Sequence, residues 1–171
     1  QHYAGWLFYR SSAPGWPLGV TQAINAPQGV SVAYTDSIPL LAVLCRPLAA
    51  ALGGTFQYFG WFTLVCFALQ GGFAALLCGL FAKGLAAPLA GSLVFAASPI
   101  LLERAFRHTS LGAQWLVLAA LYCYFVCRRQ SRFASRGLFV INILAVGIHP
   151  YFLPMTYAVT LALLLEYAVK Q

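Results

Sequence analysis

Charged residues are scarce in this chain, and acidic residues are almost absent. Only 8% of the 171 residues are charged and three of them are Asp or Glu, whereas 61% are hydrophobic. Soluble domains carry about 25% charged residues, and a chain of this length has too little interior to hide so much apolar surface from water. The composition therefore excludes a soluble globular domain, and lipid is the expected solvent for most of the chain.

Sequence motifs for metal, nucleotide or nucleophile chemistry are also missing. There is no C-x-x-C pair, no metal-ligand spacing, no glycine-rich phosphate loop and no Ser-His-Asp order. The five cysteines lie in apolar stretches, where we expect small packing residues. The net charge of +7 does not predict nucleic-acid binding, because membrane topology accounts for most of it. No signal peptide is recognisable, and we expect a fragment that lacks an N-terminal helix and a C-terminal remainder.

Two regions differ in composition. Residues 1–55 are rich in Gly, Pro, Gln, Ser and aromatics, and we expect an extracytoplasmic loop at the membrane–water interface. Its apolar stretch 38–52 is too short to span a membrane, since spanning takes about 20 residues. Arg46-Pro47 should break that stretch, which predicts an interfacial or re-entrant half-helix. Residues 56–171 are the expected transmembrane helical region, a single membrane domain.

Apolar segments in the second region predict about five spanning helices. They cover 56–82, 86–102, 111–127, 137–148 and 151–168. His149-Pro150 leaves open whether the last two are separate helices or one kinked helix. Gly71, Ala75 and Gly79 form a stripe of small residues that either brings helices close or is incidental. The predicted fold class is all-α, a polytopic transmembrane helical bundle.

The basic residues predict an orientation in the membrane. If the helices alternate, six cations fall on one side without an acid, which is the cytoplasmic signature. These are Lys83, Arg128, Arg129, Arg132, Arg136 and Lys170. The other side then receives residues 1–55 and the turns at 103–109 and 149–150, with all three histidines, Asp36 and Glu103. We expect the chemistry to gather on this extracytoplasmic face.

Four arginines on that face run against the positive-inside bias: Arg10, Arg46, Arg104 and Arg107. Arginine suits bidentate contacts to phosphate, so such a group fits a lipid-phosphate ligand. The alternative is snorkelling to the head groups, with Glu103 and Arg107 paired at i,i+4 on a helix end.

Asp36 is the only acid in the first 102 residues, and it has two interpretations. It is either an N-cap before an apolar helix with proline in its first turn, or a general base or metal ligand at the mouth of a membrane cavity. His108 follows Arg104 by four residues, so both can share a helical face, and His149 precedes a proline at a helix break. Interface histidines are as a rule structural, and the residues alone predict a polar outer face without specifying a reaction.

Several motifs carry a resemblance to a known family. They are QHYxGWxFYR at 1–10, TDSIPL at 35–40, FQYFG at 56–60, CFxLQ at 66–70, HPY at 149–151, and the spaced residues Arg104, His108, Leu111 and Gln114-Trp115. Over essentially its whole length the chain resembles an uncharacterised bacterial membrane-protein family, domain of unknown function 6311. That family is similar in layout to the GT-C glycosyltransferases, polytopic enzymes that use a polyprenyl-phosphate-linked sugar and place a catalytic acid in the first extracytoplasmic loop.

The resemblance implies a GT-C-like bundle in the bacterial inner membrane that transfers a sugar from a lipid-phosphate donor on the extracytoplasmic face. Asp36 would assist as base or metal ligand, and a divalent cation is left open as a cofactor. Whether the key acid of the GT-C layout lies upstream of Gln1 stays open, and if it does, Asp36 is a second acid or only a cap. The donor phosphate would be held by Arg10, Arg104, Arg107, His108 and His149, with His2, Arg46 and Glu103 as further candidates.

The expected partners are the lipid bilayer and the lipid-linked sugar donor, with no nucleic acid, and the oligomeric state stays open. Two alternatives remain beside the transferase. One is a transporter or flippase for a lipid-linked or anionic substrate, with the Arg46-Pro47 break in its pathway. The other is a non-catalytic membrane assembly subunit, for which the small-residue stripe would matter most.

Overall fold

The structure, a computed structural model, describes residues 2–13, 15–51, 54–130 and 135–170. Within these residues it contains eight α-helices, two 3-10 turns and one two-stranded antiparallel sheet. The helical class expected from composition is confirmed. Arg132, a member of the predicted basic group, lies outside the described residues.

The N-terminal region contains more regular structure than the expected loop. Its elements are α1 (His2–Ser11), β1 (Val20–Thr21), β2 (Val30–Ser31), the 3-10 turn η1 (Val32–Tyr34) and α2 (Pro39–Ala51). The two strands pair as a short hairpin between the helices. Trp6 and Tyr9 on α1 and Ile38 before α2 are almost completely buried, so α1 and α2 pack together around an aromatic core.

Helix α2 continues through Arg46 and Pro47, so the predicted break is wrong. Pro47 lies in the second half of the helix, where its missing N–H removes a single hydrogen bond. Arg46 stays helical with its side chain anchored, because its guanidinium donates to the carbonyl of Ser12 and lies 4.5 Å from the ring centroid of Tyr9. With 13 residues, α2 is still shorter than a membrane span, as expected.

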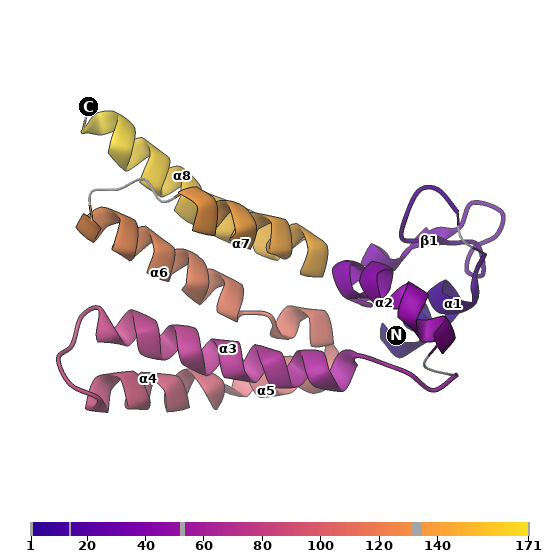
Figure 1. Ribbon diagram of the computed structural model, residues 1–171, viewed down its shortest axis with the longest axis horizontal. Helices are drawn as coiled ribbons and strands as arrows, with labels where there is room; N and C mark the ends of the chain where they lie inside the picture. The colour runs from indigo at the N-terminus through magenta and orange to yellow at the C-terminus, as the bar shows by residue number, and fades with distance from the viewer. Residues whose placement is uncertain (1, 14, 52–53, 131–134, 171) are drawn as a thin grey trace.

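The remaining six helices form a bundle in which successive helices run in alternating directions, except that the second and third of them follow one another in the same direction (Figure 1). They are α3 (Phe59–Gly79), α4 (Ala86–Ala96), α5 (Pro99–Arg107), α6 (Trp115–Gln130), α7 (Ser135–Ile148) and α8 (Phe152–Val169), with the 3-10 turn η2 (Thr109–Gly112) before α6. In the described part of the chain, three segments are long and apolar enough to cross a membrane: 59–79, 109–129 and 152–169. A fourth span exists if α4 and α5 count as one broken span, so the predicted five become three or four.

Two prolines explain the difference from five spans. Pro99 ends the segment expected at 86–102, because the residue before it leaves the helical conformation, with φ −55° and ψ 126° at Ser98. Helices α4 and α5 are therefore bent by 40° at this break. His149-Pro150 separates α7 from α8, which resolves the last pair into two helices, and α7, with 14 residues, is too short to span.

Polar side chains hold α7 and α8 together as a hairpin. Asn142 donates from Nδ2 to the hydroxyl of Thr160 at 2.9 Å, and the hydroxyl of Thr156 donates to Oδ1 of Asn142 at 2.9 Å. Interhelical hydrogen bonds of this kind replace the hydrophobic drive that helices lack in lipid.

The small-residue stripe on α3 is a helix–helix contact. A Cβ added at Gly71 would lie 2.8 Å from the hydroxyl of Ser92 on α4, and one added at Gly79 would lie 3.7 Å from Cγ of Pro88. Gly91 of α4 is equally close to α3, since its Cβ would lie 2.5 Å from Sγ of Cys78. The stripe therefore lets α3 and α4 pack with their backbones close.

The two ends of the bundle carry different elements. Figure 1 shows α1, α2, η2 and the α7–α8 break at one end, and the α3–α4 turn and the C-terminal end of α8 at the other. The second end was expected to carry cations without an acid, which is wrong. Glu166, assigned by the sequence to the interior of the last span, accepts from Nε of Arg128 and Nζ of Lys170, each at 2.8 Å.

Candidate functional site

Asp36 lies in the turn between η1 and α2, and its backbone is left-handed with φ 58°. Ile38 follows with φ 51°, a strained conformation for a β-branched residue. The carbonyl of Ile38 accepts the first helical hydrogen bond of α2, from Ala42 at 2.9 Å, so Ile38 stands at the N-cap position. Asp36 is therefore not the helix cap. Its carboxylate instead accepts a hydrogen bond from the hydroxyl of Ser110 in η2.

The other carboxylate oxygen of Asp36 lacks a hydrogen bond. Oδ2 is buried, finds no hydrogen-bond partner among the described residues, and lies 3.7 Å from Nδ1 of His108. That distance is too long for a hydrogen bond, so the contact is electrostatic. A buried polar atom without a hydrogen-bond partner lowers the stability of the fold, and such atoms are often found at functional sites. The side chain of His108 is 46% exposed and that of Asp36 only 12%, so a ligand reaches the pair from the side of His108.

The other two histidines lie close enough to feel the same charges. Burial lowers the pKa of His2 and of His149, while the negative charge of Asp36 raises both and the nearby His108 lowers them. Nδ1 of His149 accepts a hydrogen bond from the backbone N–H of Tyr151 at 3.3 Å, so the neutral ring carries its proton on Nε2. His108 thus contacts the Asp36 carboxylate, while His2 and His149 lie within range of its charge, and we call these four residues the Asp36 cluster.

Short-range contacts fix the position of the Asp36 turn. The hydroxyl of Ser37 donates to the carbonyl of His2 at 2.8 Å, and the hydroxyl of Tyr58 donates to the carbonyl of Ser37. Helix α1 approaches this turn closely at Gly5, where a Cβ would lie 2.3 Å from Oγ1 of Thr35. These supporting residues belong to the motifs at 1–10, 35–40 and 56–60, but their roles were not predictable, because they depend on contacts between α1, the turn and the start of α3.

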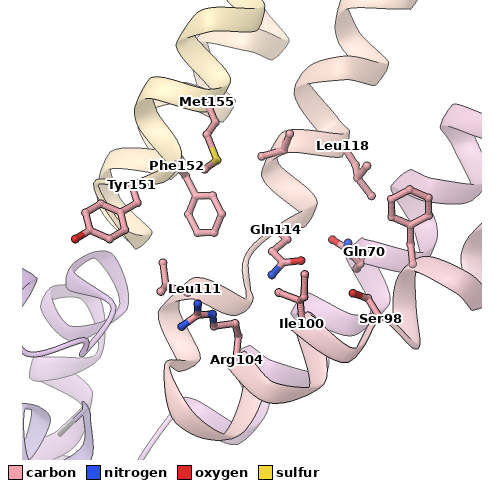
Figure 2. Close-up of a pocket in the computed structure, with 12 residues that line it drawn as sticks. Gln70, Ser98, Ile100, Arg104, Leu111, Gln114, Leu118, Tyr151, Phe152 and Met155 are labelled. Atoms are coloured by element: carbon pink, nitrogen blue, oxygen red, sulfur yellow. The ribbon is translucent and has the colours of Figure 1, made fainter.

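A pocket of about 530 Å³ lies beside the Asp36 cluster, between α3, the α4–α5 break, α6 and α8 (Figure 2). The η2 turn connects the two, because Leu111 lines the pocket while the preceding Ser110 bonds to Asp36. The wall is largely apolar, and its polar members are Gln70, Ser98, Arg104, Gln114 and Tyr151. No role was predicted for the two glutamines, although polar residues within or beside apolar spans are a signal for function.

Arg104 is the predicted phosphate-binding arginine that lines this pocket. Figure 2 shows its side chain pointing toward the space beneath Leu111 and Phe152. His108 belongs to the same turn of chain, since its backbone N–H donates to the carbonyl of Arg104 at 3.0 Å. Arg104 and His108 were predicted to share a helical face, but α5 ends at Arg107, before His108. Arg104 therefore faces the pocket, whereas His108 faces Asp36.

The other arginines have structural contacts. Arg10 lies at the far end of α1 from His2, and its guanidinium donates to the carbonyls of Ala49 and Gly54 at 3.0 and 2.9 Å. Arg107 is 75% exposed and lies 3.7 Å from Glu103, the i,i+4 pair that the sequence offered as the alternative. The structure therefore does not bring Arg10, Arg46 or Arg107 to the pocket beside Arg104.

Within the described residues, no group of three or more His, Cys, Asp or Glu side chains could hold a metal ion. The Asp36 cluster offers its side chains as charge partners and not as a ligand set. These residues do not fit the divalent cation that the GT-C resemblance left open, and we derive no step through a metal.

Comparison with known proteins gave one family. No curated protein and no solved structure matches the chain. The model of one protein family does match, and the match covers residues 1–171. The chain therefore belongs to the family described as a domain of unknown function (DUF6311), as its motifs indicated.

Proposed function

We propose that this chain is part of a GT-C-type membrane glycosyltransferase, which transfers a sugar from a polyprenyl-phosphate donor to a hydroxyl acceptor. The observation that carries the proposal is the buried Asp36 carboxylate, one oxygen of which has no hydrogen-bond partner in the described part of the chain and lies 3.7 Å from His108. Beside it, Arg104 lines an apolar pocket. These groups supply a proton acceptor, a cation for a leaving phosphate and an apolar wall for a prenyl chain.

The proposed reaction forms a bond between the acceptor oxygen and C1 of the sugar, while the bond between C1 and the phosphate oxygen breaks. Asp36 takes the proton of the acceptor hydroxyl. The electron pair of the broken bond leaves with the polyprenyl phosphate, whose charge Arg104 stabilises. His149 donates a hydrogen bond from Nε2 to the phosphate. His108, when its imidazole is protonated, stabilises the negative charge of the Asp36 carboxylate.

In this proposal the end of the bundle that carries the Asp36 cluster faces the extracytoplasmic side of the inner membrane. The support is the positive-inside tendency, because Lys83, Arg129 and Lys170 belong to the opposite end. Labelling of Arg107→Cys and Lys83→Cys in a cysteine-free background tests this orientation with a membrane-impermeant reagent. Position 107 should react from outside intact cells and position 83 only after permeabilisation, and labelling of both from one side contradicts it.

A donor-turnover assay tests the reaction itself. The full-length protein is reconstituted in liposomes with a polyprenyl-phosphate-linked sugar that is radiolabelled in the sugar. The proposal predicts release of polyprenyl phosphate together with a labelled acceptor, and loss of both products in Asp36→Asn. Turnover that persists in Asp36→Asn removes Asp36 from the mechanism.

The broken helix favours a second candidate function. Transporters commonly bind their substrate where a discontinuous helix lies near the middle of the membrane, and the α4–α5 break at Ser98 lines the pocket. This break replaces the Arg46-Pro47 break expected from the sequence. In the same liposomes a transporter or flippase would move the labelled donor across the bilayer intact, without release of polyprenyl phosphate.

A further inference from the structure

We infer that Gln70, Ser98 and Gln114 form a subsite that binds an uncharged, hydroxylated head group of an amphiphile. The three side chains come from α3, from the α4–α5 break and from the residue before α6, and they line the same pocket. Figure 2 shows them turned toward a common space, with Arg104 at the end of the pocket nearer to Tyr151. We call these three residues the amide subsite.

The unmet hydrogen-bonding capacity of Gln70 points to a ligand. Gln70 is 3% exposed, and its Oε1 is buried without a hydrogen-bond partner among the described residues. It lies near the middle of α3 (Phe59–Gly79), about 16 Å from the start of the helix at 1.5 Å per residue. An amide oxygen at this depth is far from water, so leaving it unpaired is costly, and a ligand that donates a hydrogen bond would remove the cost.

The side chains around Gln70 select the chemistry of that ligand. Oε1 of Gln70 needs a donor, while the amide of Gln114 and the hydroxyl of Ser98 can each donate and accept. None of these three side chains is charged, so a charged group placed among them would be left without a counter-charge. A group with several hydroxyls satisfies all three.

The rest of the wall indicates an amphiphile. Ile100, Leu118, Phe152 and Met155 line the pocket with apolar surface, which suits an alkyl or prenyl chain. The pocket volume of about 530 Å³ is enough for a small head group and the first part of such a chain.

Under the proposed transferase, the occupant of the amide subsite is the sugar of the donor or the hydroxyl acceptor, and this identity rests on that proposal. Binding at the subsite can be measured without turnover. A failure of the subsite is therefore distinguishable from a failure of proton transfer at Asp36.

Calorimetric binding to the full-length protein in zwitterionic nanodiscs tests the subsite, with decyl β-glucoside as the uncharged probe and decyl phosphate as the charged one. The wild type should bind decyl glucoside, and Gln70→Met should bind it roughly tenfold more weakly, the loss of about one hydrogen bond to a buried group. Gln28→Met makes the same chemical change at an exposed position of the N-terminal hairpin region and should bind as the wild type does. Decyl phosphate binding should not depend on Gln70.

A second measurement separates a ligand subsite from a structural role. Without ligand, Gln70→Met should unfold at a higher temperature than the wild type, because it removes an unpartnered buried oxygen. Should Gln70→Met not fold, Gln114→Met provides the same binding test. The subsite is overturned if the wild type does not bind decyl glucoside, or if the folded variants bind it as tightly as the wild type.

Discussion

Oδ2 of Asp36 lies 3.7 Å from Nδ1 of His108, a contact that joins the turn before α2 to the end of α5. The hydroxyl of Ser110 bonds to the other oxygen of the same carboxylate. Because Arg104 and Leu111 flank these residues and line the pocket, the turn that holds the carboxylate also shapes the pocket. A change in the position of Asp36 should therefore affect both proton transfer and ligand binding.

Gly5→Ala should displace the Asp36 turn. The new Cβ would lie 2.3 Å from Oγ1 of Thr35 and 2.5 Å from Oγ of Ser37, so the turn must move away from α1. We expect a loss of about 1–3 kcal/mol in stability, typical of overpacking, and a strong fall in donor turnover. Thermal unfolding and the turnover assay measure the two effects.

Gly60→Ala is the matched control for this change. Its Cβ would meet only Nε2 of Gln57, at 3.9 Å, and the residue lies in the first turn of α3. Alanine in a helix is favoured over glycine by up to about 1 kcal/mol, so this variant should be as stable as the wild type or slightly more so. Equal behaviour of the two variants would contradict the close approach of α1 to the Asp36 turn.

Arg104→Met should weaken donor use, whereas Arg107→Met should not. Both residues lie in the last turn of α5, but Arg104 lines the pocket and Arg107 is 75% exposed beside Glu103. Loss of a cation that contacts a phosphate should lower kcat/KM at least tenfold, because charge-assisted hydrogen bonds contribute roughly 1.5–3 kcal/mol. An exposed ion pair contributes about 0–1 kcal/mol, so Arg107→Met should stay close to the wild type. A similar decrease in kcat/KM in the two variants would contradict a contact between Arg104 and the donor phosphate.

The stability of the folded chain should decrease as the pH is lowered below 6.5, the ordinary pKa of imidazole. Burial lowers the pKa of His149 below 6.5 in the folded chain, against the opposing attraction of Asp36. The unfolded chain then binds more protons than the folded chain between the folded pKa and 6.5, so stability rises with pH through that window and is level above it. His149→Gln removes this titration, and its thermal unfolding should depend less steeply on pH below 6.5 than that of the wild type. An unchanged pH dependence would show that His149 does not titrate in this way.

The helical class, and the gathering of Asp36 and the histidines at one end, were predictable because apolar runs and alternating helices depend on the order of residues alone. The contact partners of the individual charged side chains were not predictable. Arg10 and Arg46 bind main-chain carbonyls of other elements, and Ser110 bonds to Asp36, contacts that exist only once α1, α2 and η2 are packed together. Glu166 was missed as an acid because it lies inside an apolar helix and pairs with Arg128 of another.

Donor turnover by Asp36→Asn, compared with Glu103→Gln, tests the central claim most directly. Asparagine keeps the size of the side chain but cannot take a proton at the position of Oδ2, whereas Glu103 is an exposed acid on α5, the helix that ends beside His108. Both variants are first shown to unfold at temperatures close to that of the wild type. We predict that Asp36→Asn releases no polyprenyl phosphate and that Glu103→Gln retains wild-type release. Release by folded Asp36→Asn at the wild-type rate would contradict the account.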